Sequence, residues 1–213
     1  KQHLHQPVAK EVVLTTGALW EGNTCAYYTI FRDGNIFRMY YRGSHWDTKT
    51  KKATHREVVC YAESKDGIHW TKPRLRQFAY KGSRDNNIIW SGPGSHNFSA
   101  FLDQRPGCPA QERFKAFGGL KSTTGGMVLF TSADGIRWKK ARDKAVITNG
   151  AFDSSNIGFW DPTINKYRAY WRYFTEGVTE ADNWKPASLM RVWARSRSMP
   201  ATLGTLDPGP PST

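Results

Sequence analysis

Two carboxylates stand where this chain could carry out acid–base chemistry. Glu21 and Asp153 each occupy the expected start of an inner strand in a repeated β unit. Two opposed carboxyl groups can cleave a glycosidic bond, at separations of about 5–5.5 Å for retention or roughly 6.5–9.5 Å for inversion. We therefore predict Glu21 and Asp153 as catalytic residues. Each also has a structural interpretation, because an Asp before Ser-Ser-Asn often caps a turn and a Glu before Gly can be solvated.

Side chains that suit a sugar occur at the same expected end of the β units. Amides and guanidinium groups supply several hydrogen-bonding groups to hydroxyls, and aromatic rings offer large apolar faces. On this basis, substrate contacts are expected from Trp20, Asn23, Arg42, His96, Asn97, Asn156 and Arg172.

Some of these residues have a competing structural interpretation. Asn23, Asn97 and Asn156 recur at matching positions, which favours a role in tying off backbone groups over ligand contact. His96 could be a general acid or a metal ligand, but it has no partner at ligand spacing, and packing within a loop is the alternative. The sequence predicts no metal site and no cofactor.

The element that must position these residues is a repeat. The sequence SKDGIHW at Ser64–Trp70 returns as SADGIRW at Ser132–Trp138. Asp-Gly supplies a turn that tolerates a positive φ, and the Trp can fold back onto the sheet. The aspartates of this turn, Asp66 and Asp134, are expected to be structural.

Matching strands surround the two turns. Aromatic and apolar alternation bounded by Gly, Asn and Asp predicts strands with a buried face. Four antiparallel strands in each unit make a propeller blade. The expected strands are Tyr27–Asp33, Phe37–Arg42, Val58–Glu63 and one at Trp70; Ser99–Asp103, Phe114–Phe117, Met127–Ser132 and one at Trp138; and Gly158–Asp161 and Tyr167–Arg172.

Propeller geometry explains why the candidate residues should meet. The inner strands surround the axis and run in the same direction, so their starts converge on one mouth. The ends of the second strands return to that rim with Arg42 and Arg172, and Glu57 is expected on the same side but further out. The hairpin turns at the opposite end contain three aspartates with an expected structural role, Asp33, Asp103 and Asp161.

The sequence predicts an all-β chain that is mainly a partial propeller. Its expected parts are an N-terminal extension at 1–16, blades at about 17–75, 90–142 and 150–178, and an irregular, Pro-rich tail at 179–213. Two and a half to three blades are fewer than a closed propeller needs, so the chain looks truncated, and its open edge predicts self-association.

Composition limits the remaining possibilities. The 213 residues contain no apolar run of membrane-spanning length, so no membrane span is expected. Cys25, Cys60 and Cys108 predict free thiols, with a Cys25–Cys60 bridge as the alternative. The first five residues do not resemble a signal peptide. The net charge of +13 permits a polyanionic partner, but the basic residues fall mostly in loops and outer strands, which makes nucleic acid an unlikely partner.

The Ser-x-Asp-Gly-x-x-Trp turns and their flanking strands resemble the five-bladed propellers of glycoside hydrolase families 32 and 43 and related bacterial proteins. The resemblance covers roughly residues 17 to 175. It implies a secreted or periplasmic protein, an acidic base or nucleophile in the first blade, and further carboxylates in later blades. This chain differs by offering Glu21 and Asn23 where an Asp is expected. The turn also resembles the sialidase Asp-box but is one residue shorter. A sialidase-like function, with Arg42 and Arg172 in the arginine cluster that it requires, is a lower-ranked alternative because no third Arg is placed.

Three functions follow from these observations. The leading hypothesis is a glycosidase-like propeller that hydrolyses an oligo- or polysaccharide with a carboxylate pair. The second is a carbohydrate-binding propeller without catalysis, for sulfated or uronic-acid glycans in view of the basic charge. The third, ranked lower, is a scaffold for proteins or nucleic acid, which would require a continuous basic face.

Overall fold

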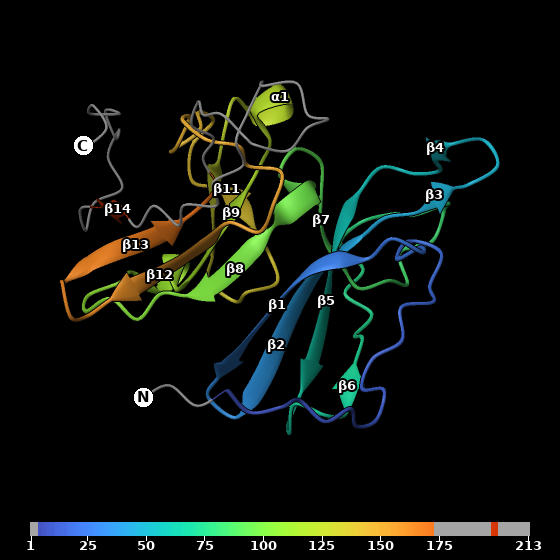
Figure 1. Cartoon of the computed structure of the whole chain (residues 1–213), viewed down its shortest axis with the longest axis horizontal. Coiled ribbons are helices and arrows are strands. Elements are labelled where there is room, and N and C mark those ends of the chain that lie inside the picture. Colours follow the sequence, from blue (N-terminus) through green and yellow to red (C-terminus); the bar gives the residue numbers. More distant parts are fainter. Residues whose placement is uncertain (1–3, 173–196, 200–213) are drawn as a thin grey trace, which may run out of the picture.

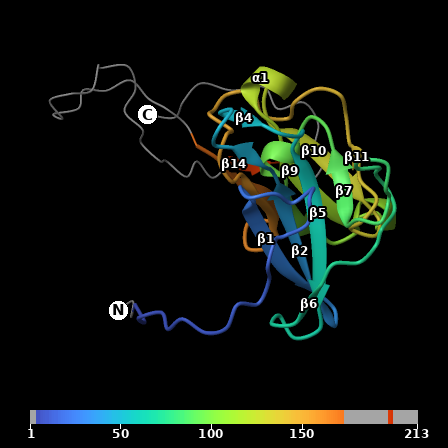
Figure 2. The same ribbon diagram turned by 90° about the vertical axis from the view of Figure 1, so that its right-hand side faces the viewer.

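The computed structural model describes residues 4–172 and 197–199, and in this part the chain is all-β. Helical structure there is limited to short turns: η1 (Ser95–Asn97), η2 (Ala110–Glu112) and α1 (Lys121–Thr124). No helix in the described part is long and apolar enough to cross a membrane. Residues 4–17 contain neither helix nor strand, and in Figure 2 they run away from the first strands.

The first sheet contains the repeat turn that opened the sequence pattern. Its strands follow one another in the order β1-β2-β5-β6, all antiparallel, and β7 pairs with the other end of β5. A small hairpin of β3 and β4 projects from it (Figure 1). The bounds are β1 (Ala26–Asp33), β2 (Ile36–Gly43), β3 (Trp46–Asp47), β4 (Lys52–Ala53), β5 (Val58–Ser64), β6 (Trp70–Thr71) and β7 (Ile88–Ser91).

The second sheet repeats the four-stranded order, and the third continues it. Strands β8 to β11 pair antiparallel in sequence order, and β13 lies between β12 and β14. Each strand predicted from the sequence has a counterpart, but the one expected at Trp138 begins at Lys139, and the one expected over Tyr167–Arg172 ends at Tyr170. The bounds are β8 (Ser99–Leu102), β9 (Phe114–Gly118), β10 (Val128–Ser132), β11 (Lys139–Lys140), β12 (Ile157–Asp161), β13 (Lys166–Tyr170) and β14 (Arg197–Met199).

Strand β14 lies within the expected C-terminal tail. The sequence predicted an irregular tail over 179–213, and in it Arg197–Met199 pair with β13 and add a strand to the third sheet. Three residues without a Pro can extend a sheet even inside a Pro-rich segment, because they need only backbone groups of an edge strand as partners. The rest of that tail, and the expected end of the third blade at 173–178, lie outside the described residues.

The sheets pack face to face through their alternate side chains. Successive residues of a strand point to opposite faces, so Tyr40 and Tyr61 of the first sheet meet Phe114 and Phe130 of the second in one buried cluster. The opposite face of the second sheet packs against the third in a separate cluster. That cluster contains Phe101, Phe117 and Leu129 from the second sheet and Trp160, Tyr167 and Trp171 from the third sheet or its end.

The first strands of the three sheets lie together. Strand β8 contacts β1 on one side and β12 on the other, and Figure 1 shows β8 between the two neighbouring sheets. Side chains from three different sheets can therefore meet at the end of the molecule where β1, β8 and β12 begin. This arrangement is what places the candidate site.

The two repeat turns have the same hydrogen bonds. In the second turn, Ser132 Oγ accepts a bond from the Gly135 amide at 2.9 Å, and Asp134 accepts from two following amides at 2.7 and 2.8 Å. The Trp138 indole donates to the Gly135 carbonyl at 3.0 Å. The first turn repeats these contacts within about 0.1 Å, so Asp66 and Asp134 are structural, as the sequence predicted.

The hairpin aspartates are structural as well. Asp103 is buried, and its Oδ2 receives bonds from Lys115 Nζ and the Tyr167 hydroxyl, both at 2.6 Å, which joins the second sheet to the third. Burial opposes ionisation of Asp103, but these donors outweigh it and lower the pKa of the carboxyl. Asp33 pairs with arginines of its own and the next sheet, and Asp161 pairs with Arg168.

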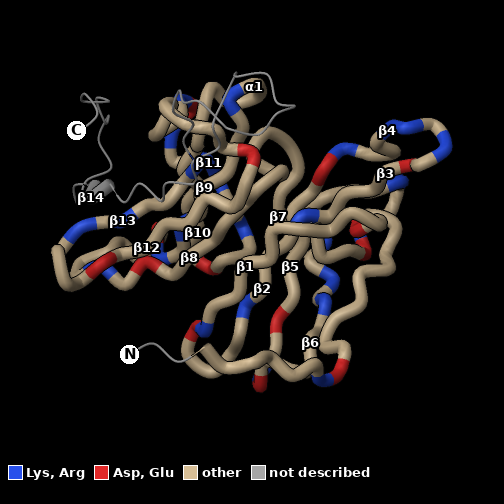
Figure 3. The backbone as a smooth tube through the Cα atoms, viewed as in Figure 1, with Lys and Arg blue, Asp and Glu red and all other residues tan. Residues whose placement is uncertain are grey.

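Charged residues are spread over several elements. Figure 3 shows Lys and Arg on the outer strands with acidic residues among them, and a basic group on the β3–β4 hairpin. All three cysteines, Cys25, Cys60 and Cys108, are free thiols, as predicted.

The two turn glycines make a matched test of sheet packing. Gly67 and Gly135 both have a positive φ, 80° and 75°, so replacing either with Ala should cost about 1–2 kcal/mol in backbone strain. A Cβ at Gly135 would also lie 2.8 Å from the Tyr40 hydroxyl, whereas one at Gly67 meets only the Phe37 ring at 3.8 Å. Urea unfolding should therefore show Gly135→Ala to be the more destabilising change, by about 1 kcal/mol or more. Equal losses would contradict the tight contact between the first two sheets.

Candidate functional site

A β-bulge at the start of β1 gives the candidate site its central residue. The register between β1 and β2 shifts between Ala26 and Thr29, so two residues of β1 stand opposite one of β2. In this bulge Tyr27 has a φ of 55°, in the left-handed region that aromatic residues rarely occupy. Such strain costs about 1–3 kcal/mol and is often found at functional sites.

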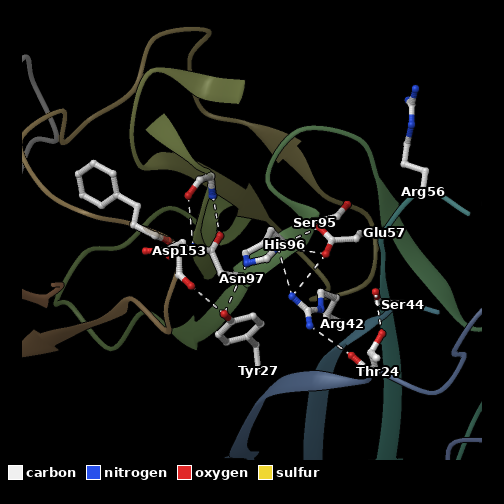
Figure 4. A network of polar contacts seen from close by, with 12 residues as sticks. Thr24, Tyr27, Arg42, Ser44, Arg56, Glu57, Ser95, His96, Asn97 and Asp153 are labelled. Carbon is white, nitrogen blue, oxygen red and sulfur yellow. Dashed lines mark hydrogen bonds and ion pairs between the residues drawn. The ribbon is translucent and has the colours of Figure 1, made fainter. Parts of the chain in front are cut away.

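The bulge aims the Tyr27 side chain at two other sheets or their connecting segments. Its hydroxyl donates to the backbone carbonyl of Asp153 at 2.8 Å and lies 3.5 Å from His96 Nε2. The guanidinium of Arg42 lies 4.8 Å from the centre of the Tyr27 ring, at cation–π distance. Figure 4 shows Tyr27 between Asp153 and the group formed by His96, Arg42 and Glu57.

That group is a compact ionic cluster. His96 Nδ1 lies 3.0 Å from each oxygen of the Glu57 carboxylate, and Arg42 Nη1 lies 3.4 Å from Glu57 Oε1. Burial opposes ionisation of Glu57, but the hydrogen bond and charge of His96 and the charge of Arg42 outweigh it and lower the pKa of the carboxyl. Glu57 is therefore ionised at neutral pH, which suits a base or an orienting group better than a general acid.

Asp153 provides the accessible carboxylate of the site. Its side chain is 61% exposed and forms an ion pair with Arg172, which is largely buried. Asp153 therefore remains open to a ligand while its position is fixed on one side by a cation.

A cavity of about 300 Å³ opens beside the ionic cluster. Polar groups of His96, Glu57 and Ser95 line it, so a ligand there would touch the same residues that contact Tyr27 or its partners. Arg56 also lines the cavity, and in Figure 4 its side chain points away from the cluster. The remaining lining residues are Gly92, Pro93, Gly94, Leu120 and Thr123.

The structure does not bring Glu21 and Asp153 together as the sequence predicted. Glu21 is fully buried and accepts bonds from the Tyr41 hydroxyl at 2.5 Å and from Lys72 Nζ at 2.7–2.8 Å. Its Oε2 also accepts the Ala18 amide. A buried carboxylate with these partners has no surface to offer a substrate, so the expected catalytic position of Glu21 is corrected to a structural one.

Each of the three asparagines bonds to backbone groups; Asn97 and Asn156 are buried, whereas Asn23 is exposed. Asn97 is fully buried, and its Oδ1 accepts a hydrogen bond from the Gly119 amide at 2.8 Å. Its Nδ2 donates to the carbonyls of Phe152 and Ser154. These bonds tie the second sheet to the segment before β12. Asn156 donates to the same two carbonyls, at 3.1 and 3.0 Å. The amide of Asn23 pairs with both backbone groups of Trp46.

Trp20 lies elsewhere than the sequence predicted. Its indole donates to Asn87 Oδ1 at 2.7 Å, and its ring packs edge-on against Tyr80. Both contacts belong to the side of the first sheet that faces away from the second. The expected residues that the structure does gather at the site are Arg42, His96, Asp153 and Arg172.

Two members of the site were absent from the predicted set. Glu57 was placed on the correct side but too far out, because the sequence did not show that His96 would reach it. Tyr27 was read only as a strand residue, since nothing in the letters AYYTI distinguishes a bulge from regular pairing. Within residues 4–172 and 197–199, no group of His, Cys, Asp or Glu is placed to hold a metal ion.

No protein-family model and no curated protein sequence matches this chain. Among solved structures, it is similar to a glycosyl hydrolase from Bacteroides ovatus, with 15% identity, a TM-score of 0.40, and coverage of 70% of this chain and 42% of that one. It is also similar to a structure described as belonging to the GH130 mannoside phosphorylase family, at 17% identity, a TM-score of 0.39 and coverage of 70% and 41%.

A third similar structure is a glycoside hydrolase with 13% identity, a TM-score of 0.46, and coverage of 83% of this chain and 56% of that one. The chain thus spans about half the length of these proteins.

The ionic cluster predicts a specific dependence of stability on pH. The folded pKa of Glu57 is lowered from an unfolded value of about 4.3, so the unfolded state takes up the proton first as the pH falls. At neutral pH, Glu57→Gln should reduce the free energy of unfolding by about 1 kcal/mol. This difference should shrink as the pH falls below about 4.

Urea unfolding at several pH values checks this expectation. Glu11→Gln, in the exposed N-terminal stretch, is the control for loss of one carboxylate. A difference that stays constant or grows on acidification would show that the His96 and Arg42 contacts do not stabilise the ionised form of Glu57.

Proposed function

We propose that this chain is part of a glycosidase-like β-propeller that binds a carbohydrate at the end where β1, β8 and β12 begin. The reacting carboxylate is Asp153, and Arg42, His96 and Arg172 position the sugar. The finer organisation proposed is the predicted one, with blades at about 17–75, 90–142 and 150–178. The order of four antiparallel strands that the first two sheets share, the matching hydrogen bonds of their turns, and the contacts of β8 with β1 and β12 support this architecture.

The observation that carries the proposal is the strained position of Tyr27. A β-bulge and a positive φ turn an aromatic side chain from β1 onto Asp153 and His96, which belong to later parts of the chain. An exposed carboxylate, guanidinium groups and aromatic faces then surround one point, as sugar recognition requires.

A second candidate function is carbohydrate binding without turnover. The observation that favours it is the pairing of both carboxylates with cations, Glu57 with Arg42 and Asp153 with Arg172. An ion-paired carboxylate is a poor proton donor, yet it remains a good hydrogen-bond acceptor for sugar hydroxyls.

Asp153→Asn separates the two functions. The purified chain is first applied to a glycan array, and the retained glycans are then incubated with it and analysed for cleavage. If Asp153 is catalytic, the Asn variant should retain its ligand and lose turnover by about a hundredfold or more. If the chain only binds, the wild type will show no cleavage and the variant will change affinity alone.

The matched control is Asp85→Asn. Asp85 is also an exposed Asp paired with an Arg, at 3.2 Å from Arg76, but it lies in the connector between β6 and β7. It should behave as wild type in both assays. The absence of any retained glycan would contradict the proposed function.

A further inference from the structure

Three side chains of the site are arranged as a proton relay. The Tyr27 hydroxyl faces Nε2 of His96 at 3.5 Å, and the opposite ring nitrogen, Nδ1, faces Glu57 at 3.0 Å. An acid–base group, an imidazole that passes a proton on, and a carboxylate that orients the imidazole form the usual order of such relays. The longer first contact is common where no substrate is bound.

The hydrogen-bond partners show which groups can donate. An ionised Glu57 can only accept, so a hydrogen bond between it and His96 requires a proton on Nδ1. Arg42 Nη1 lies 3.2 Å from the same nitrogen, but it also only donates, and its charge is offset by Glu57. Because the Tyr27 hydroxyl gives its proton to the Asp153 carbonyl, its lone pairs remain available to a proton on Nε2.

Among the groups around His96, Tyr27 is the one that can exchange a proton with the imidazole. The imidazole contacts Arg42 of β2, Glu57 just before β5, and Tyr27 of β1. Of these, only the Tyr27 hydroxyl can both donate and accept a hydrogen bond, because a guanidinium only donates and an ionised carboxylate only accepts. The Tyr27 hydroxyl is also the group next to Asp153.

We infer that Tyr27 is the general acid of this site and that His96, oriented by Glu57, restores its proton. The inference rests on the proposed function and supplies the acid that the buried Glu21 cannot provide. The substrate class is a glycoside whose leaving group is an alcohol that needs protonation, such as another sugar.

The step balances as a hydrolysis. Tyr27 turns its hydroxyl from the Asp153 carbonyl and gives the proton to the glycosidic oxygen as the bond from that oxygen to the anomeric carbon breaks. His96 enters the cycle with a proton on each ring nitrogen, and it passes the Nε2 proton to the Tyr27 phenolate while the Nδ1 proton stays on the contact with Glu57. Water adds to the anomeric carbon, and the Asp153 carboxylate takes the proton that this water loses. That proton returns to His96 through solvent, so one water is consumed and the side chains are regenerated.

Tyr27→Phe tests this role with a series of leaving groups. The substrates are paired dinitrophenyl and phenyl glycosides of glucose, galactose, mannose, xylose and arabinose in both anomeric forms. Dinitrophenolate leaves without a proton, whereas phenolate needs one. The variant should therefore lose about a hundredfold or more in kcat/KM on the phenyl glycoside of the accepted sugar, and less than about tenfold on its dinitrophenyl partner.

Tyr28→Phe is the matched control. Tyr28 lies in the same bulge, but its ring stacks on Tyr41 at 5.5 Å on the other side of the strand. It should keep wild-type rates with both leaving groups. Equal losses with the two leaving groups in Tyr27→Phe, or no loss, would overturn the inference, and so would a wild type that binds a glycan without cleaving it.

A second measurement tests the relay without a substrate, and it can be made even if the array retains no glycan and the proposed function fails. The ¹⁵N resonances of the His96 ring are recorded in wild type, Tyr27→Phe and Glu57→Gln. The relay predicts that Tyr27→Phe shifts Nε2 and that Glu57→Gln shifts Nδ1. A His96 ring that does not respond to Tyr27→Phe would overturn the relay on its own.

Discussion

The second sheet has no free face, and the rest of the structure depends on this constraint. Its alternate side chains enter two different cores, one shared with the first sheet and one with the third. Each buried aromatic ring contributes about 2–3 kcal/mol through the area it removes from water. Ordering the second sheet therefore fixes its neighbours on both sides, and with them the positions of β1, β8 and β12.

The same constraint explains how a site can form from distant parts of the chain. Tyr27, His96 and Asp153 belong to segments of three sheets, yet they meet because the first strands of those sheets lie side by side. The hydrogen bonds of Asn97 stabilise this junction, because they join Gly119 to the segment before β12. The strain at Tyr27 can persist because packed sheets hold the strand on either side of it.

Much of this fold was visible in the sequence, and the reason is local. Runs rich in aromatic residues and bounded by Gly, Asn or Asp, such as Phe37–Arg42, are typical of strands, and the Ser, Asp and Gly of each repeat turn make their bonds within a few residues. Strand positions and turns could therefore be predicted without knowledge of tertiary contacts. β14 could not be, because its pairing depends on an available edge of β13 rather than on its own composition.

The site was less predictable because its chemistry depends on burial and on register. Glu21 and Asp153 are both acidic residues near a strand start, and only the tertiary structure shows that Lys72 and Tyr41 enclose one of them. Arg42, His96 and Arg172 were identified because propeller geometry brings strand ends to one rim. The role of Tyr27 was not predicted, because a one-residue bulge reverses the face of the sheet from which a side chain emerges. No residue type in this stretch signals the bulge.

The shared faces of the second sheet also imply a particular order of opening. A sheet held by two neighbours must break two interfaces to expose its backbone. Amide protons of β9 and β10 should therefore exchange with solvent only after both of these interfaces have opened. The Asp103–Lys115–Tyr167 contact strengthens this coupling, since unzipping the third sheet would leave a buried ion pair without one of its donors.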